Sequence, residues 1–213
     1  MEPVLLPAIL AGAFIAIQTA VWWVQPRTRG RRLLRKVRNV PIAEIKDGEW
    51  VKVTGVARAI GAVGISLIGR RDCIGFQTQV QLLGRNTGGT IVLRRESCPT
   101  FTIVDGTGTV DVDGPFLFAI DWDHGWSMVT AQGLRILREC GVQTRGLIFW
   151  RRFAYREALI QPGDVITVFG LATFEADPTE PPTDLRSPAL KIHLRGSGNQ
   201  RVILADAGRR VSR

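Results

Sequence analysis

Polar and apolar residues alternate in several short stretches of the chain, which is the pattern of half-buried β-strands. The clearest stretch is 76–82, FQTQVQL, and another is 50–54, WVKVT. Turns rich in glycine, asparagine and proline separate such stretches, for example at 86–89 and 161–163. The pattern predicts strands over residues 50–54, 76–82, 90–95, 101–104, 109–112, 164–169, 190–194 and 202–204. Most of the chain is therefore expected to form a mainly β domain.

One stretch has the period of a helix. Leu134, Leu137 and Cys140 recur at helical spacing within 127–140, which predicts an amphipathic α-helix there. Gly133 is the residue in it that disfavours a helix. The segment 175–188 contains four acids and four prolines, so it is predicted to be a solvated loop.

Two strand segments repeat one pattern. Residues 48–55, GEWVKVTG, and 163–170, GDVITVFG, both follow G-[ED]-x-[VI]-x-V-x-G. The final glycine of each is expected where the backbone bends or another chain approaches closely. Two such strands framing many short ones suit a small curved barrel of the OB kind. The alternative is a coincidence between two ordinary strand starts.

A stretch of 21 residues without charge, 4–24, precedes these elements. In a helix rising about 1.5 Å per residue it spans about 30 Å, the thickness of a bilayer hydrocarbon core. Trp22 and Trp23 stand at its end, where a spanning helix meets the lipid headgroups. A cleaved signal peptide would instead need cations before the run, where only Glu2 is charged, and small residues after it. The sequence predicts a retained single-pass transmembrane helix.

The net charge of +9 is concentrated directly after this run. Residues 39–213 hold 21 basic and 18 acidic groups, a net charge of only +3, so a basic stripe for nucleic acid is not expected. The positive-inside rule places the N-terminus outside and the domain in the cytoplasm. The predicted contacts with the membrane surface are Trp22, Trp23, Arg27, Arg29, Arg31, Arg32, Arg35, Lys36 and Arg38.

The predicted organisation is a transmembrane anchor at 1–25, a flexible basic linker at 26–40 and a β-barrel domain at 41–213. The cations of the linker have two interpretations that are compatible with each other. They set the topology of the anchor, or they also contact anionic lipid headgroups, each contributing about 1 kcal/mol near the surface.

The residues that most often perform chemistry are sparse. Cys73, Cys98 and Cys140 are too few and too scattered for a zinc site or a disulfide framework, and they fit a reducing compartment. Cys73 is expected to be a buried structural thiol rather than a nucleophile. The segment 121–124, DWDH, is interpreted as a polar loop, and Glu157 as a cap or an ion-pair member. We therefore predict no catalytic residue, no metal and no cofactor.

Aromatic and basic side chains interleave over 149–156, FWRRFAYR. Alternation places Trp150 and Arg152 on one face of an extended segment and Arg151 on the other. Such a set could stack bases or lie at a membrane interface, but it could equally supply core residues and a solvated basic edge. Trp150, Arg151 and Arg152 are taken as a possible partner-binding edge.

Four motifs stand in a fixed order along the chain. They are I-x-D-G at 45–48 before the first repeated strand, SLIGRRDCIGF at 66–76, FTIVDGTG at 101–108, and REALIQPGD at 156–164 before the second repeated strand. Over about residues 42–206 the chain resembles the GIDE domain, the membrane-adjacent part of mitochondrial RING-type ubiquitin ligases, which also occurs in bacterial proteins. The resemblance implies a β-rich, OB-like module beside a membrane.

Ubiquitin ligation is not implied, because in those ligases it belongs to a zinc-binding RING that this sequence does not contain. The expected fold is mainly β, a small OB-like barrel with one amphipathic helix, preceded by an N-terminal transmembrane helix. The expected function is a membrane-anchored, non-catalytic module that holds an unidentified protein partner next to the bilayer. The alternatives are an OB-type nucleic-acid-binding protein and a cysteine-dependent enzyme.

Overall fold

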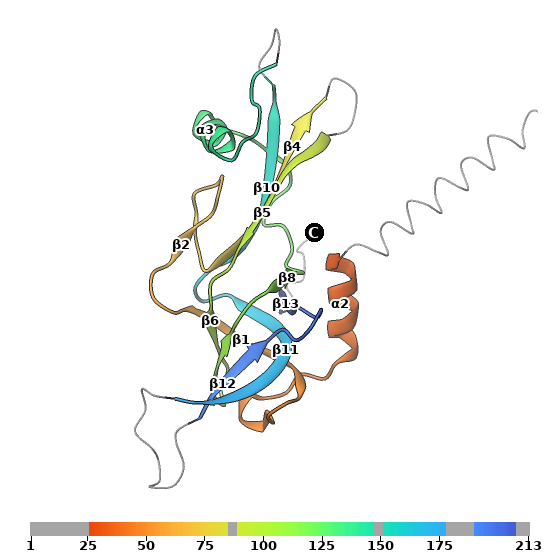
Figure 1. Ribbon diagram of the computed structural model, residues 1–213, viewed down its shortest axis with the longest axis vertical. Helices are drawn as coiled ribbons and strands as arrows, with labels where there is room; N and C mark the ends of the chain where they lie inside the picture. Colours follow the sequence, from red (N-terminus) through yellow and green to blue (C-terminus); the bar gives the residue numbers. More distant parts are fainter. Residues whose placement is uncertain (1–25, 85–88, 147–150, 178–189, 208–213) are drawn as a thin grey trace, which may run out of the picture.

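The computed structural model describes residues 26–84, 89–146, 151–177 and 190–207. Figure 1 shows an elongated molecule with a β-barrel at one end and a second, smaller sheet at the other. Within the described residues no helix is both long and apolar enough to cross a membrane. The predicted span at 4–24, with Trp22 and Trp23, lies outside the described residues.

Five strands form a closed barrel. Their order is β1, β6, β7, β12, β11, and β11 pairs back with β1. All neighbouring pairs are antiparallel except β7 and β12, which are parallel. The strands are β1 (Trp50–Ala59), β6 (Phe101–Val104), β7 (Thr109–Val112), β11 (Val165–Ala176) and β12 (Leu190–Arg195). The prediction of a mainly β fold containing a small barrel is confirmed.

The barrel interior is a single apolar core. Val53, Phe101, Ile103, Val168 and Leu194 are each fully buried in it. Two more strands, β13 (Val202–Asp206) and β8 (Phe116–Phe118), continue the sheet beyond β11. Each of the eight predicted strands has a counterpart in the structure.

The repeated segments pair with each other. β1 and β11 run antiparallel with Val53 opposite Val168, so the equivalent positions of 48–55 and 163–170 are related by a local two-fold axis. The repeat is therefore not a coincidence between unrelated strands, because it forms the seam that closes the barrel.

Hydrogen bonds at both ends of this seam obey the same two-fold symmetry. The Gly48 amide donates to the Ala172 carbonyl at 2.9 Å, and the equivalent Gly163 amide donates to the Ala57 carbonyl at 2.9 Å. Gly48 and Gly163 both have positive φ, 77° and 93°, which glycine adopts without steric cost. The positive φ thus falls on the first glycine of each segment and not on the last, where the pattern had suggested strain.

The second sheet is built from two insertions, one between β1 and β6 and one between β7 and β11. Its strands, in order, are β5 (Gly89–Ser97), β4 (Gly75–Leu83), β10 (Phe153–Ile160) and β9 (Ser127–Met128). A short hairpin, β2 (Gly64–Ile65) with β3 (Asp72–Cys73), lies in the first insertion. The long strand β10 was not among the predicted strands.

Helix α3 (Ala131–Glu139) packs on one face of this sheet through Leu137, next to Val80 and Phe153. It is the predicted amphipathic helix, shortened at its start because Ser127–Met128 forms β9. A β-carbon on Gly133 would lie 2.7 Å from Val129 Cγ1. Close packing therefore explains the glycine that had counted against the helix.

The flexible linker predicted at 26–40 is wrong for most of its length. Residues Pro26–Lys36 form helix α2, and a 3-10 turn, η1 (Ile42–Glu44), follows before β1. Pro26 occupies the first helical position, where a missing N–H costs little. The predicted loop 175–188 is also corrected at its start, where Glu175 and Ala176 end β11, and 178–189 lie outside the described residues.

Candidate functional site

Helix α2 is docked on the barrel by its narrow apolar side. Leu34 is 7% exposed and packs with Ala119, Phe169 and Ile203, whereas the neighbouring Leu33 is 41% exposed. Gly30 is buried, and a β-carbon there would lie 3.2 Å from Ile203 Cγ2. The helix therefore approaches the sheet closely at Gly30 and is held in one position.

Arg31 fixes the same helix through polar contacts. Its Nε donates to the Ala119 carbonyl at 2.8 Å, and Nη2 lies 2.5 Å from Asp121 Oδ1 and 3.7 Å from Asp206 Oδ2. Asp206 also accepts from the Asp121 amide at 2.6 Å. Arg31 was predicted to contact the membrane surface, but the structure directs it onto the barrel, where it joins the helix to two acids.

The other cations of the segment have different surroundings. Arg35, Lys36 and Arg38 are exposed, and within the described residues no carboxylate lies within ion-pair distance of them. Cations in the last turn of α2 interact favourably with the carbonyl end of the helix dipole. Arg32 is partly exposed, and the side chains of Arg27 and Arg29 lie outside the described residues.

Lys52, which was not singled out from the sequence, completes this surface. It extends from β1, and its Nζ donates to the Leu34 carbonyl at 3.0 Å. A cleft of about 370 Å³ separates α2 from the barrel at this point. It is lined on the helix by Arg31, Leu34 and Arg35 and on the barrel by Lys52, Asp121, Thr167, Ala205 and Asp206.

The docking of α2 leads to a testable difference between two adjacent leucines. We expect Leu34→Ala to lower the free energy of unfolding by about 2–3 kcal/mol, because it empties a buried site. Leu33→Ala is the matched control and should change it by less than about 0.5 kcal/mol, since that side chain faces solvent. Urea denaturation of the purified full chain measures both, and equal effects would show that α2 is not docked.

The predicted partner-binding edge is only partly described. Trp150 lies outside the described residues, whereas Arg151 and Arg152 are exposed and the following Phe153 is buried beneath α3. The Arg151 amide donates to the Thr144 carbonyl at 3.3 Å. The segment therefore supplies both a core residue and solvated cations.

Arg156, the third cation of this segment, has defined contacts that the sequence did not reveal. The Arg156 guanidinium lies over the rings of Trp122 and Trp126, 4.3 Å and 4.5 Å from their centroids. Its Nε and Nη2 donate to Gln79 Oε1 at 3.2 Å and 2.9 Å. Burial lowers the pKa of Arg156 from its ordinary value. Arg156 therefore occupies one face of each indole.

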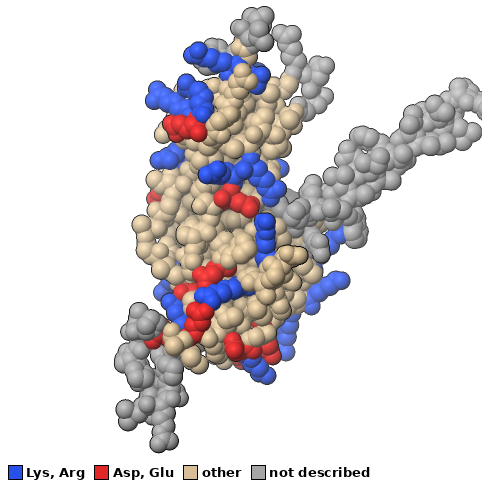
Figure 2. Space-filling model, viewed as in Figure 1, with Lys and Arg blue, Asp and Glu red and all other residues tan. Residues whose placement is uncertain are grey.

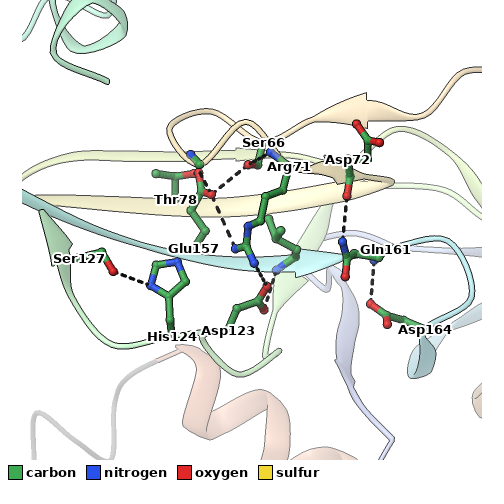
Figure 3. A network of polar contacts seen from close by, with 12 residues as sticks. Ser66, Arg71, Asp72, Thr78, Asp123, His124, Ser127, Glu157, Gln161 and Asp164 are labelled. Atoms are coloured by element: carbon green, nitrogen blue, oxygen red, sulfur yellow. Dashed lines mark hydrogen bonds and ion pairs between the residues drawn. The ribbon is translucent and has the colours of Figure 1, made fainter. Parts of the chain in front are cut away.

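Glu157 is the most completely enclosed charge in the described residues. Its carboxylate accepts hydrogen bonds from the Ser66 hydroxyl at 2.9 Å, the Thr78 hydroxyl at 2.8 Å, and the amides of Ile68 and Gly69 at 3.0 Å and 3.2 Å. Figure 3 shows it meeting Ser66 and Thr78, with Arg71 beside it. Every donor points at the carboxylate, so Glu157 caps the loop 66–71 and leaves no room for a substrate.

The acids and the histidine of 121–124 do not converge. Asp121 contacts Arg31, Asp123 Oδ2 lies 3.0 Å from Arg71 Nη1, and His124 Nδ1 lies 3.3 Å from the Ser127 hydroxyl. In the part of the chain that the structure describes, no group of three or more potential ligands could hold a metal ion. The interpretation of 121–124 as a polar loop agrees with these separate partners.

Two of the three cysteines, Cys73 and Cys98, are placed unfavourably for nucleophilic chemistry. Cys73 is buried, and desolvation together with the charge of Glu157 raises its pKa to about 11. Burial, with a smaller effect of Cys73, raises the pKa of Cys98 to about 12. Both thiols are therefore protonated near pH 7, whereas the thiolate is the nucleophilic form.

The outer face of β12 pairs its cations with acids on and beside β7. Lys191 Nζ lies 2.8 Å from Asp111 Oδ2, and Asp113 Oδ2 accepts from Arg195 Nε and contacts His193 Nδ1, both at 3.0 Å. Figure 2 shows acidic residues beside the basic ones over this end of the molecule. The strands β7 and β12 therefore do not present the one-sided positive surface that binds nucleic-acid backbones.

Neither models of known protein families nor curated protein sequences match this chain.

Proposed function

We propose that this protein is a membrane-anchored, non-catalytic interaction module that holds partner proteins next to the bilayer. The observation that carries the proposal is the docking of α2, which begins two residues after the apolar run 4–24 and is fixed to the barrel through Leu34, Gly30 and Arg31. A helix that spans the membrane would then be joined to a rigid helix rather than to a free chain, so the domain would keep a limited range of orientations at the surface.

The barrel is proposed to be OB-like and to belong with the GIDE domains. Counted along the chain, the five barrel strands are β1, β6, β7, β11 and β12. The first pairs with the fourth, and the third pairs in parallel with the fifth, which supports this relationship. In OB barrels the second and third strands commonly carry the ligand-binding face. Here Asp111 on β7, the third strand, lies on the outer face and pairs with Lys191, which does not favour the nucleic-acid alternative.

The proposed topology has the N-terminus outside and the domain in the cytoplasm, because seven cations follow the apolar run and only Glu2 precedes it. We expect the full chain to remain in membranes extracted with alkaline carbonate. In intact cells, a cysteine introduced at exposed Glu49 should react with a permeant maleimide and not with an impermeant one. Labelling of this cysteine by the impermeant reagent would overturn the orientation.

Partner holding is tested by photo-crosslinking in intact membranes. A photoreactive residue at exposed Arg151 or Arg152 is compared between the full chain and a chain in which the residues 4–24 are replaced by a soluble sequence. Anchoring confines the domain to the surface, so the yield of a given crosslinked protein should fall by about tenfold or more on release. Capture of the same protein with equal yield by the released domain would contradict the proposal.

A further inference from the structure

The cleft between α2 and the barrel has an unbalanced charge. The lining of the cleft carries three cations and two acids, a net charge of +1. Arg31, one of the cations, contacts both acids, Asp121 and Asp206. The two remaining cations, Arg35 and Lys52, face the same cleft, and no carboxylate within the described residues forms an ion pair with either of them. The cleft is therefore an electropositive recess beside a helix that begins at the predicted membrane surface.

The donors in this recess are suited to an oxyanion. The Lys52 ammonium group has three N–H donors. One of them donates to the Leu34 carbonyl, which holds the group at the wall of the cleft. Arg35 has five donors in a planar fork that matches the oxygens of a phosphate. Leu34 and Ala205 add an apolar part to the lining. The volume of about 370 Å³ is within the range of small-ligand pockets.

We propose that this cleft binds a phosphate-bearing group through Arg35 and Lys52, the chemistry of an anionic phospholipid headgroup or of a soluble phosphate ester. The lipid source rests on the proposed membrane function and the soluble source does not. A bound headgroup would bridge α2 and β1 and so tighten the docking of the domain against the bilayer. Binding weakens as salt is added, since both cations are partly open to solvent.

The test uses the full chain purified in detergent or incorporated into phosphatidylcholine nanodiscs with and without phosphatidylglycerol. The variant is Arg35→Gln with Lys52→Gln. The matched control is Lys36→Gln with Arg38→Gln, which removes the same charge from exposed positions outside the cleft. Native mass spectrometry measures the retained phosphatidylglycerol relative to phosphatidylcholine, and calorimetry in detergent measures binding of inorganic phosphate and glycerol 3-phosphate.

We expect the cleft variant to lose about tenfold in phosphatidylglycerol retention and the control to lose less than about threefold. If phosphatidylglycerol retention and glycerol 3-phosphate binding both fall in the cleft variant, the cleft accepts the phosphate from either source. If only glycerol 3-phosphate binding falls, the ligand of the cleft is a soluble phosphate ester. Equal losses in variant and control, or no loss in either, overturn the proposal. If Lys52→Gln lowers the melting temperature, the same binding measurements are made on the single variant Arg35→Gln, with Arg38→Gln as its control.

Failure of the proposed membrane function and failure of the proposed anion site are distinguished by different measurements. A chain that is released from membranes by alkaline carbonate would refute the anchor. The calorimetric comparison of inorganic phosphate binding in detergent would still decide whether Arg35 and Lys52 form an anion site.

Discussion

Replacing Glu157 by alanine is expected to lower the free energy of unfolding by about 3–5 kcal/mol. The change removes the acceptor of four hydrogen bonds and leaves the donors of Ser66, Thr78 and the loop amides without a partner in a site that excludes water. It also leaves Arg71 with Asp123 as its remaining acidic contact. Chemical denaturation of the full chain measures the loss.

Two further variants separate this effect from a general loss of charge. Glu157→Gln keeps the shape but cannot accept from every donor, so its cost should be smaller, about 2 kcal/mol. Glu49→Ala removes an exposed carboxylate from the start of β1 and should change stability by less than about 0.5 kcal/mol. A Glu157→Ala protein that unfolds at the same urea concentration as the Glu49→Ala protein would disprove the buried network.

Gly55→Ala is expected to destabilise the barrel by about 3 kcal/mol or more, whereas Gly170→Ala should cost about 1 kcal/mol. A β-carbon at Gly55 would lie 2.5 Å from the Val104 carbonyl oxygen, which belongs to the backbone of β6 and cannot turn away. At Gly170 the nearest atom, Leu194 Cβ, is 3.2 Å away, so a small shift relieves the contact.

The two glycines occupy equivalent positions in the repeated segments, which makes each the control for the other. The sequence pattern predicts a bend or a close approach at both glycines. The structure makes the two sites unequal because β6 approaches β1 more closely than β12 approaches β11 at the matching point. Melting curves of the two alanine variants test this difference. Equal melting temperatures would show that the seam is symmetric in packing as well as in hydrogen bonding.

The motifs that carry the resemblance to the GIDE domain serve the fold. Glu157, in the last of the four motifs, caps the loop formed by the second. Asp105, in the third, accepts from the Thr107 and Gly108 amides of its own turn and from the Ile42 amide. Asp47, in the first, accepts from the Phe174 amide. These residues of the four motifs therefore stabilise the architecture of the domain.

The proposed membrane attachment and the proposed anion site make separate physical demands on α2. Attachment requires only that the helix connect the apolar run to the barrel, and Leu34 and Gly30 suffice for that. The cleft requires that Arg35 and Lys52 be left without acidic partners, and Arg31 achieves this by contacting Asp121 and Asp206. The seven-cation segment therefore combines a docking residue, Arg31, with one residue of the proposed anion site, Arg35.

The sequence by itself determined the elements whose pattern is local. The strand at 50–54 shows its alternation within the stretch because one of its faces is buried. The repeat at 48–55 and 163–170 showed that two strands have related environments. The interpretation of Glu157 as a cap or ion-pair member also followed from its lack of a partner acid nearby in the sequence.

Only the tertiary structure decided what depends on distant residues. Helix α2 has two leucines among eleven residues, too few to predict an amphipathic helix, and it is held by β8, β13 and the residues after them. The acceptor of Arg31 lies 88 residues away, and the donors to Glu157 lie 79 to 91 residues away. Such partners meet only when the insertions fold onto the barrel. The positions of the cations in the basic segment are visible in the sequence. Which of them contacts the barrel depends on the tertiary structure.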